Sequence, residues 1–271
     1  MMYNADFLIA AVVILLLVLR NFLDQKRAED LNSRVFLFFA VIGILDVIAE
    51  FSKQLLYNFQ EMGDFGLAAV VTTTIFYLFQ ALLPYTLLCY IMTLHDNKLI
   101  SVKKMLLAGI ATILLVSIVL TNPFTEKLFY FDISAGYVEG PWYRLMYYSA
   151  LFHLAVILIL VISWKKEFGP QKIKVILDIL ILCGCGVVIQ LLYYPLLMTG
   201  FGMSLGILAL FLTINNPNAN RDSLTGVYNH LYLTRRSDEL IAAGKSFHII
   251  TIYLYQLKHI NKVAGVEGGD Y

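Results

Sequence analysis

Three ionisable side chains lie within one of the most apolar stretches of the chain. Asp46, Glu50 and Lys53 are spaced at i, i+4 and i+7, so a helix places all three on one stripe. Charges are costly in lipid and normally face a bundle interior, water or one another. The stripe is therefore typical either of a proton or ion pathway or of an internal contact in which Glu50 pairs with Lys53. The long stem of Lys53 also allows its ammonium to reach the membrane surface.

Two other polar side chains stand alone in apolar runs. Asp178 lies near the start of the sixth such run, and a transporter would use it together with Asp46 and Glu50. The sequence has no internal repeat like those that relate transporter halves, which weakens this hypothesis. His153 stands alone in the fifth run, and a lone imidazole there is typical of an interhelical hydrogen bond rather than of a ligand.

The composition is that of a membrane protein. Hydrophobic residues make up 59% of the 271 residues and charged residues only 14%, and the mean hydropathy is +0.75. Globular domains carry about 25% charged residues. The formal net charge of +1 gives no sign of a nucleic-acid partner. The three cysteines lie in apolar runs without metal-ligand neighbours, so we interpret them as packing residues.

Seven apolar stretches are candidates for membrane-spanning helices, which predicts a mainly α fold built as a seven-helix bundle. The first has neither a basic leader nor a small-residue cleavage site, which favours an anchor over a signal peptide. The Gly-Cys-Gly at 184–186 and the Thr-Thr-Thr at 72–74 are typical of close helix contacts. Region 1–214 is therefore expected to be one polytopic unit in a lipid bilayer. The seven stretches cover residues 5–22, 35–56, 67–94, 105–121, 145–164, 175–194 and 201–214.

The basic residues between the spans predict their orientation. Lys and Arg gather in the loops after the first, third and fifth spans, whereas the opposite loops hold only Lys53, Lys127 and Arg144. This pattern places the N-terminus outside and everything after residue 214 in the cytoplasm. The longest outer loop, 122–144, is rich in aromatic residues, Gly and Pro. It is typical either of an interfacial lid or of part of an extracellular sensing surface.

The composition changes sharply after the last span. Asn, Pro and Ala replace the apolar run over a connector at 215–221, where a proline bars continuation of the helix. Asp222 or the serine after it can cap a new helix over 224–243. Residues 246–255 are rich in β-branched and aromatic side chains and predict a strand. The tail is thus expected to begin an α/β domain.

Motifs in the tail resemble those of the GGDEF family of bacterial diguanylate cyclases. The stretch RDSLTGVYNHLYL matches the motif of the family's first helix, and YLYQLKHINKVAGVEGGD follows the next motifs in order and without a gap. The matching residues are Asp222, Leu224, Thr225, Gly226, Asn229, Lys258, Ile260, Asn261, Gly265, Gly269 and Asp270. The resemblance implies a partial GGDEF-like α/β domain at 222–271, with the signature hairpin beyond this segment. The membrane half is also similar to seven-span sensor regions that precede GGDEF or histidine-kinase modules.

The departures from the family pattern concern its metal site. Tyr253 occupies the position of the family's metal-binding Asp, and Tyr255, Lys262 and Val266 replace further motif residues. Joining two GTP molecules needs a divalent cation, and Mg²⁺ prefers hard carboxylate oxygens to a neutral phenol. The resemblance therefore implies a chain with no catalytic residue, no metal ligand and no cofactor. Mg²⁺ is expected only in an active full-length cyclase.

A remnant of a nucleotide site is the second implication of the resemblance. Asn261 and Asp270 match the positions with which the family reads guanine, and Lys258 lies in the same motif as Asn261. An amide and a carboxylate supply the acceptors and the donor that a guanine edge requires. The alternative is that they are ordinary polar groups of a helix or turn.

These features predict a bacterial inner-membrane sensory protein with a degenerate, catalytically inactive GGDEF-like tail and an unknown extracellular or intramembrane signal. A shift of the last span would pass through the connector to the tail and to a second copy of the chain in a homodimer. Three alternatives stay open: a membrane-anchored diguanylate cyclase that makes cyclic di-GMP, a polytopic transporter, and a receptor whose tail binds a guanine nucleotide without turnover. Residues 216–271 are few for an independent domain, so we expect a fragment, an early-terminated product or the start of a larger module.

Overall fold

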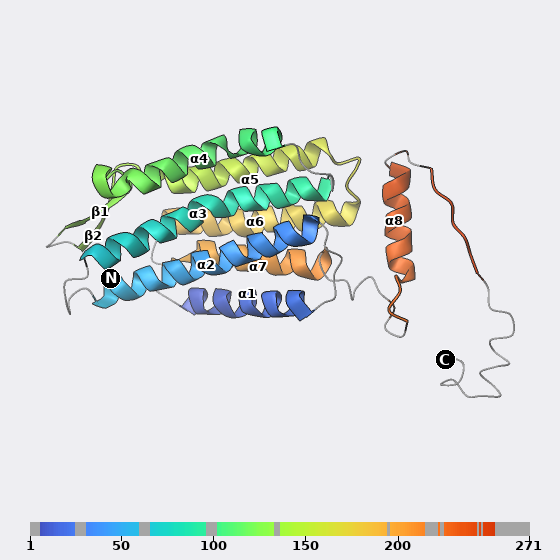
Figure 1. Cartoon of the computed structure of the whole chain (residues 1–271), viewed down its shortest axis with the longest axis horizontal. Helices are drawn as coiled ribbons and strands as arrows, with labels where there is room; N and C mark the ends of the chain where they lie inside the picture. The colour runs from blue at the N-terminus through green and yellow to red at the C-terminus, as the bar shows by residue number, and fades with distance from the viewer. Residues whose placement is uncertain are drawn as a thin grey trace, which may run out of the picture.

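The computed structural model describes most of the chain, and Figure 1 shows how its elements are arranged. The described residues are 6–24, 31–59, 66–95, 102–132, 136–193, 196–214, 222, 225–242, 244 and 246–252. Within them the fold is mainly α, with one small two-stranded sheet. The helices are α1 (Asp6–Asp24), α2 (Leu31–Phe59), α3 (Gly66–His95), α4 (Val102–Thr125), α5 (Leu145–Ser163), α6 (Pro170–Leu192), α7 (Met198–Thr213) and α8 (His230–Ala242).

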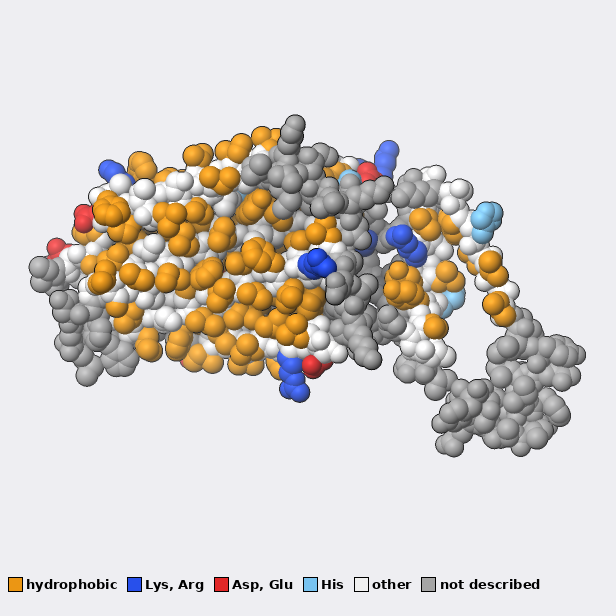
Figure 2. All heavy atoms as spheres, in the orientation of Figure 1, with side chains coloured by type: hydrophobic (Ala, Val, Ile, Leu, Met, Phe, Trp, Pro, Cys, Tyr) orange, Lys and Arg blue, Asp and Glu red, His pale blue; other side chains and the backbone are white. Residues whose placement is uncertain are grey.

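Six of the described helices, α1 to α6, are long and apolar enough to cross a membrane. The seventh, α7, is also apolar but has only 16 residues, which is about 24 Å of helix against a bilayer core of about 30 Å. The prediction of long spans is therefore confirmed for six helices. Figure 2 shows hydrophobic side chains covering the visible face of the bundle, while the coloured charged side chains lie towards its ends. This is the surface of a polytopic membrane protein.

The helices α1, α2, α3, α5, α6 and α7 pack in a closed ring, because α1 contacts both α2 and α7. Helix α4 lies outside this ring against α3 and α5. Large apolar side chains fill the interior, and Leu15, Phe39, Tyr90, Ile157 and Ile207 are all almost fully buried. Helix α1 begins at the end of the bundle that carries the strands, whereas α7 leads to α8 at the opposite end (Figure 1). We call these the hairpin end and the tail end.

Helices α6 and α7 approach each other closely through glycines. A Cβ atom on Gly202 would lie 2.7 Å from the carbonyl oxygen of Leu182, and one on Gly186 would lie 2.9 Å from that of Met198. A Cβ on Gly184 would instead have its nearest neighbour at 3.9 Å. The close helix contact that the Gly-Cys-Gly predicted is therefore made by its second glycine.

The segment between α4 and α5 forms an antiparallel hairpin. Strand β1 (Phe129–Asp132) pairs with β2 (Gly136–Glu139), with Phe129 opposite Glu139. The side chain of Asn122 fixes the start of the hairpin to α4, since its Nδ2 donates to the carbonyl oxygen of Phe129 at 2.9 Å and its Oδ1 accepts from the N–H of Leu128 at 2.7 Å. The predicted outer loop is thus an ordered element that packs on the bundle.

The tail helix begins later than the sequence predicted. Asp222 Oδ1 accepts hydrogen bonds from the N–H and the hydroxyl of Thr225, at 2.9 and 3.0 Å, and so closes a turn. Gly226 follows with a φ of +69°, a left-handed conformation that interrupts a helix. Asn229 Oδ1 then accepts the N–H of Tyr232 at 3.0 Å and caps α8. The predicted helix start at 224 was wrong, because Asp222 caps the turn and Asn229 caps the helix.

The predicted strand at 246–255 is not formed in its described part. Residues 246–252 have no regular secondary structure, and a strand gains its hydrogen bonds only beside a neighbouring strand. The remaining residues, 253–271, lie outside the described part of the chain. The described tail therefore holds a turn and a helix, and the predicted α/β domain is not shown.

Candidate functional site

The ionisable stripe predicted on the second span lies in the bundle interior. Asp46, Glu50, Lys53 and Gln54 of α2 are 1%, 1%, 0% and 2% exposed, and we call them the polar stripe. They are enclosed because α2 packs against α1, α3 and α7. The interpretation in which Lys53 extends to the membrane surface was wrong, since its whole side chain lies inside the bundle.

Aromatic rings and carboxylates surround the charge of Lys53. Its Nζ lies 3.7 Å from the ring centroid of Phe76 and 6.0 Å from that of Tyr77, both on α3. Glu50, one turn away on α2, and Glu139 on the hairpin both act on it electrostatically. An ammonium over an aromatic face gains about 2 kcal/mol or more when it is desolvated. The stripe therefore contains a cation held jointly by rings and acidic groups.

Gln190 connects the polar stripe to three further helices. Its Nε2 donates to Glu50 Oε1 at 3.2 Å, and its Oε1 accepts from the backbone N–H of Thr199 at 2.7 Å. The phenol of Tyr147 on α5 lies close to the Gln190 side chain. Because Thr199 lies in the first turn of α7, one amide on α6 joins α2, α5 and the start of α7.

Tyrosines join the hairpin to the same cluster. The hydroxyl of Tyr137 on β2 lies 2.7 Å from that of Tyr77 on α3, within hydrogen-bonding distance. The ring of Tyr137 also stacks on Tyr57 of α2, with centroids 5.0 Å apart, and the Tyr57 hydroxyl lies 2.9 Å from Thr73 Oγ1. The Thr-Thr-Thr of α3 thus contributes a helix contact, as predicted, and the hairpin is fixed to both α2 and α3.

A series of side-chain contacts, with one electrostatic interaction between Lys53 and Glu50, therefore runs from the hairpin to α7. It passes from Tyr137 through Tyr77 and Lys53 to Glu50, and from there through Gln190 to the N–H of Thr199. We call this series the coupling path. The sequence analysis identified Glu50 and Lys53 but missed the tyrosines and Gln190. The only sign of Gln190 in the sequence was an amide near the end of an apolar run.

Several buried polar atoms beside the coupling path have no hydrogen-bond partner. Both amide atoms of Gln54, Oδ1 of Asp46 and Oγ1 of Thr199 are enclosed and unpaired. Leaving such a group unpaired costs about 1–3 kcal/mol. Native proteins retain few of them, and those that persist often mark a functional site or a bound water. The cluster therefore has unused capacity for hydrogen bonds.

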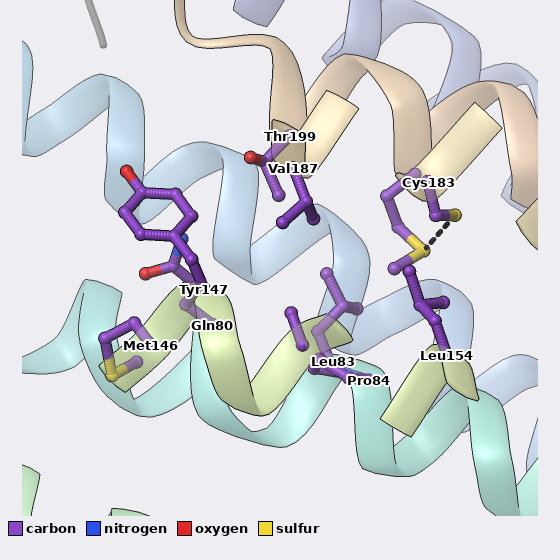
Figure 3. Close-up of a pocket in the computed structure, with 11 residues that line it drawn as sticks. Gln80, Leu83, Pro84, Met146, Tyr147, Leu154, Cys183, Val187 and Thr199 are labelled. Atoms are coloured by element: carbon purple, nitrogen blue, oxygen red, sulfur yellow. Dashed lines mark hydrogen bonds between the residues drawn. The ribbon is translucent and has the colours of Figure 1, made fainter. Parts of the chain in front are cut away.

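A small cavity lies next to the end of the coupling path. Its volume is about 20 Å³, and it lies between α3, α5, α6 and α7. Figure 3 shows Gln80, Tyr147 and Thr199 among its lining residues, with their oxygen atoms directed away from Pro84 and Leu154. The surface of the cavity is therefore almost wholly apolar, although polar residues are among those that line it.

The other two predicted intramembrane residues lie apart from this cluster. His153 Nε2 lies 3.0 Å from Thr112 Oγ1 on α4, and its Nδ1 donates to the carbonyl oxygen of Ser149 at 2.7 Å. The predicted interhelical hydrogen bond is thus confirmed. Asp178 is exposed on the outer surface of α6, so the structure does not bring it together with Asp46 and Glu50.

The hairpin contributes one carboxyl with an altered titration. Burial raises the pKa of Glu139 above its usual range, although part of its side chain reaches solvent. A hydrogen bond from Tyr143 and the charges of Arg144 and Lys53 act in the opposite direction on the same pKa. The hairpin therefore carries a group whose charge depends on both pH and the buried ammonium.

The tail motif is only partly described. Asp222, Thr225, Gly226 and Asn229 form the turn and cap given above, and their observed role is local structure. Leu224 and the positions expected to hold metal or nucleotide lie outside the described residues. These are Tyr253 at the expected metal position and Lys258, Asn261 and Asp270 at the expected nucleotide positions, and the motif residues Gly265 and Gly269 lie outside as well. In the described part of the chain, no group of three or more His, Cys, Asp or Glu side chains is placed to hold a metal ion.

Comparison with protein-family models, with curated proteins and with solved structures finds no match to this chain. The fold and the buried polar cluster therefore assign this chain only to a broad class of protein. It is a polytopic membrane protein whose interior holds a charged, hydrogen-bonded cluster.

Proposed function

We propose that this chain is a bacterial inner-membrane signalling protein, in which α1 to α7 form a seven-span sensor and the tail receives the signal. The observation that supports this most is the coupling path. It joins a hairpin at one end of the bundle to the first turn of α7, the helix that leads to the tail at the other end. A displacement of the hairpin changes the contacts of Tyr77 and Lys53, and thereby the hydrogen bond that holds the start of α7.

The proposed orientation has the hairpin outside and the tail in the cytoplasm. It rests on the excess of Lys and Arg in the loops at the tail end. It also requires α7 to be a seventh span, since an odd number of crossings is needed to place the tail opposite the N-terminus. A helix of 16 residues can cross if the bilayer thins around it, at a modest cost in free energy.

The tail, in this proposal, is a degenerate GGDEF-like domain that relays a signal and makes no cyclic di-GMP. The support is the resemblance of its motifs, together with Tyr253 at the position where the family binds metal. Its partners would be a second copy of the tail or a guanine nucleotide at Asn261 and Asp270. Purified chain incubated with GTP and Mg²⁺ should yield no cyclic di-GMP at any protein concentration, and formation of product would contradict this part.

The sensory role is tested at the end of α7. A nitroxide label is placed at Thr213→Cys in a background in which the exposed thiol is removed by Cys185→Ala, and the protein is held in lipid nanodiscs. Tyr137→Phe removes the hydroxyl bonded to Tyr77, and the label spectrum should change because α7 moves. Tyr130→Phe is the matched control, since this tyrosine lies on β1 of the same hairpin and is 36% exposed. Identical spectra for the parent and Tyr137→Phe would refute the proposed coupling.

A further inference from the structure

The polar stripe encloses more acid than base. Asp46 and Glu50 are each 1% exposed and Lys53 is fully buried, so two carboxyls share one ammonium inside the bundle. If all three were ionised, the interior would hold one uncompensated negative charge. A charge left unpaired in an apolar medium is so costly that the group is neutralised instead. Charge balance within the stripe therefore calls for one further positive charge.

No neighbouring element supplies this charge in the described part of the chain. Helices α1, α3 and α7 pack on α2, and α7 has no charged side chain. The hairpin adds another acid, Glu139, which acts on Lys53. The phenols of Tyr77 and Tyr147 are near enough to feel the charge of Glu50, and neutral phenols carry none themselves. The charged side chains and imidazoles of α1, α3, α5 and α6 lie near helix ends, on the outer surface or against α4: Asp6, Arg20, Asp24, His95, His153, Lys172, Lys174 and Asp178.

The hydrogen bonds distinguish the two carboxyls of the stripe. Glu50 Oε1 accepts a hydrogen bond from Gln190 Nε2 at 3.2 Å, and Lys53 acts on Glu50 from i+3 on the same helix. Asp46 lies two turns from Lys53, and its Oδ1 is enclosed with no hydrogen-bond partner. An ionised carboxylate is stabilised by donors to its oxygens, which Glu50 has and Asp46 Oδ1 lacks. Glu50 is therefore the ionised partner of Lys53, and Asp46 is the group that must be neutralised.

The packing around the carboxyls favours a proton over a metal ion. A Cβ atom on Gly200 of α7 would lie 3.1 Å from Val47 Cγ2 and 3.5 Å from Glu50 Oε2, so the backbone of α7 lies directly against this part of the stripe. Hard cations take about six oxygen ligands. Among the described residues, no group of three His, Cys, Asp or Glu side chains is placed to hold a metal. A proton needs one carboxyl oxygen and no additional space.

We propose that Asp46 is a proton-binding site inside the membrane, so that the stripe holds one proton in addition to the ammonium of Lys53. Loss of this proton puts a second negative charge one turn from Glu50. The new charge competes with Glu50 for Lys53 and so disturbs the centre of the coupling path. Proton activity is then a signal for α7, a consequence that rests on the proposed sensory function, whereas the proton site itself does not.

Infrared spectra of the full chain test the site, because a protonated carboxyl has a C=O stretch separate from that of a carboxylate. Nanodiscs of ether-linked lipids contribute no ester carbonyl, and Glu139→Gln in every sample removes the partly buried hairpin carboxyl. At neutral pH this reference protein should show a carboxylic acid band that Asp46→Asn abolishes. Asp178→Asn, which changes an exposed aspartate, should keep it, and the amide bands of the same spectra report whether each variant is folded. No band in the reference, or a band that persists in folded Asp46→Asn, would overturn the proposal.

Removing the ammonium gives a second, quantitative measurement. In Lys53→Met no positive charge remains, so both carboxyls should bind a proton and the band should become about twice as large. Adding Asp46→Asn to Lys53→Met should return the band to its reference size, since Glu50 alone then carries a proton. A band of reference size in Lys53→Met would show that charge balance does not set the protonation of the stripe, and would also contradict the proposal.

The label at Thr213→Cys separates this inference from the sensory function. Raising the pH until the Asp46 band disappears should change the label spectrum of the reference protein and not that of Asp46→Asn. If the band is absent but the label responds to Tyr137→Phe, the proton site is wrong and the sensory function stands. If the band behaves as expected but the label responds neither to pH nor to Tyr137→Phe, the proton site stands and the sensory function is wrong.

Discussion

At the scale of single residues, the buried charges are held by partners far away along the chain. Glu50 accepts a hydrogen bond from Gln190, which lies 140 positions later, and Lys53 lies over rings of α3. The sequence predicted the stripe on α2 because its spacing is a local property of one helix. It could not predict Gln190 as a partner, since that depends on which helices enclose the stripe. A single amide in an apolar helix is compatible with many packing arrangements.

Replacing Gln190 with Leu should destabilise the protein. The substitution keeps a similar side-chain volume but leaves the Glu50 carboxylate and the Thr199 N–H buried without their partner. We expect a loss of about 2 kcal/mol in the free energy of unfolding, because a buried polar group left unpaired costs about 1–3 kcal/mol. Reversible unfolding in mixed detergent micelles measures it.

Replacing Gln54 with Leu should leave the free energy of unfolding unchanged or raise it, in contrast to Gln190→Leu. Neither amide atom of Gln54 has a hydrogen-bond partner, and the side chain is 2% exposed. Exchanging an unpaired buried amide for an apolar group of similar volume removes a desolvation cost. Gln54→Leu should therefore unfold at the same or a higher denaturant concentration than the parent. A loss as large as that of Gln190→Leu would show that the contacts of Gln190 contribute nothing specific.

The Glu139 carboxyl should make stability depend on pH. Burial raises the pKa of Glu139 in the folded state above 4.5, the ordinary value for a glutamate side chain. The folded state therefore binds this proton more tightly than the unfolded state does. Its contribution to stability is therefore present at low pH and lost as pH rises through the folded-state pKa. Glu139→Gln should make the pH dependence of the free energy of unfolding flatter above pH 4.5. An unchanged profile would contradict this assignment.

At the scale of elements, the apolar runs of the sequence predicted the long helices well. The polar segments were predicted poorly. The ranges of α1 to α6 agree with the expected spans, apart from extra turns at helix ends, because a helix that faces lipid is apolar all round. The helix predicted from 224 failed at Gly226, where the left-handed conformation overrides the cap signal of Asp222. The hairpin was also missed as an element, since Asn122 fixes it from the last turn of α4.

The close approach of α6 and α7 can be tested with matched glycine substitutions. Gly202→Ala places a methyl group 2.7 Å from a backbone carbonyl oxygen of α6, so the helices must separate. Overpacking of this kind costs about 1–3 kcal/mol. Gly184→Ala, whose nearest neighbour would be at 3.9 Å, should be neutral or stabilise by up to about 1 kcal/mol through helix propensity. Equal unfolding midpoints for the two variants would rule out the tight contact.

At the scale of the whole molecule, seven apolar helices carry one end of the chain to the opposite end of the bundle. Composition and hydropathy were enough to predict a polytopic membrane protein, because the lipid-facing surface dominates so small a bundle. The arrangement of the helices was not predictable in this way. The ring from α1 to α7, with α4 outside it, depends on which faces fit together.

The proposed orientation of the bundle predicts which surfaces a membrane-impermeant maleimide reaches. In the Cys185→Ala background, Tyr130→Cys on the hairpin should be labelled in spheroplasts. Lys166→Cys, in the exposed turn after α5 at the tail end, should be labelled only after lysis. The reverse pattern would place the tail outside and remove the basis for a cytoplasmic output.

The central claim is that the hairpin acts on α7 through Gln190, and a double-mutant cycle on the label at Thr213→Cys tests it most directly. The spectral change is measured for Tyr137→Phe, for Gln190→Leu and for both together. If the coupling path carries the effect, the double variant should match Gln190→Leu alone, because the hairpin can no longer reach α7. Two changes that simply add would show that the hairpin and Gln190 act on α7 independently, and would contradict the account.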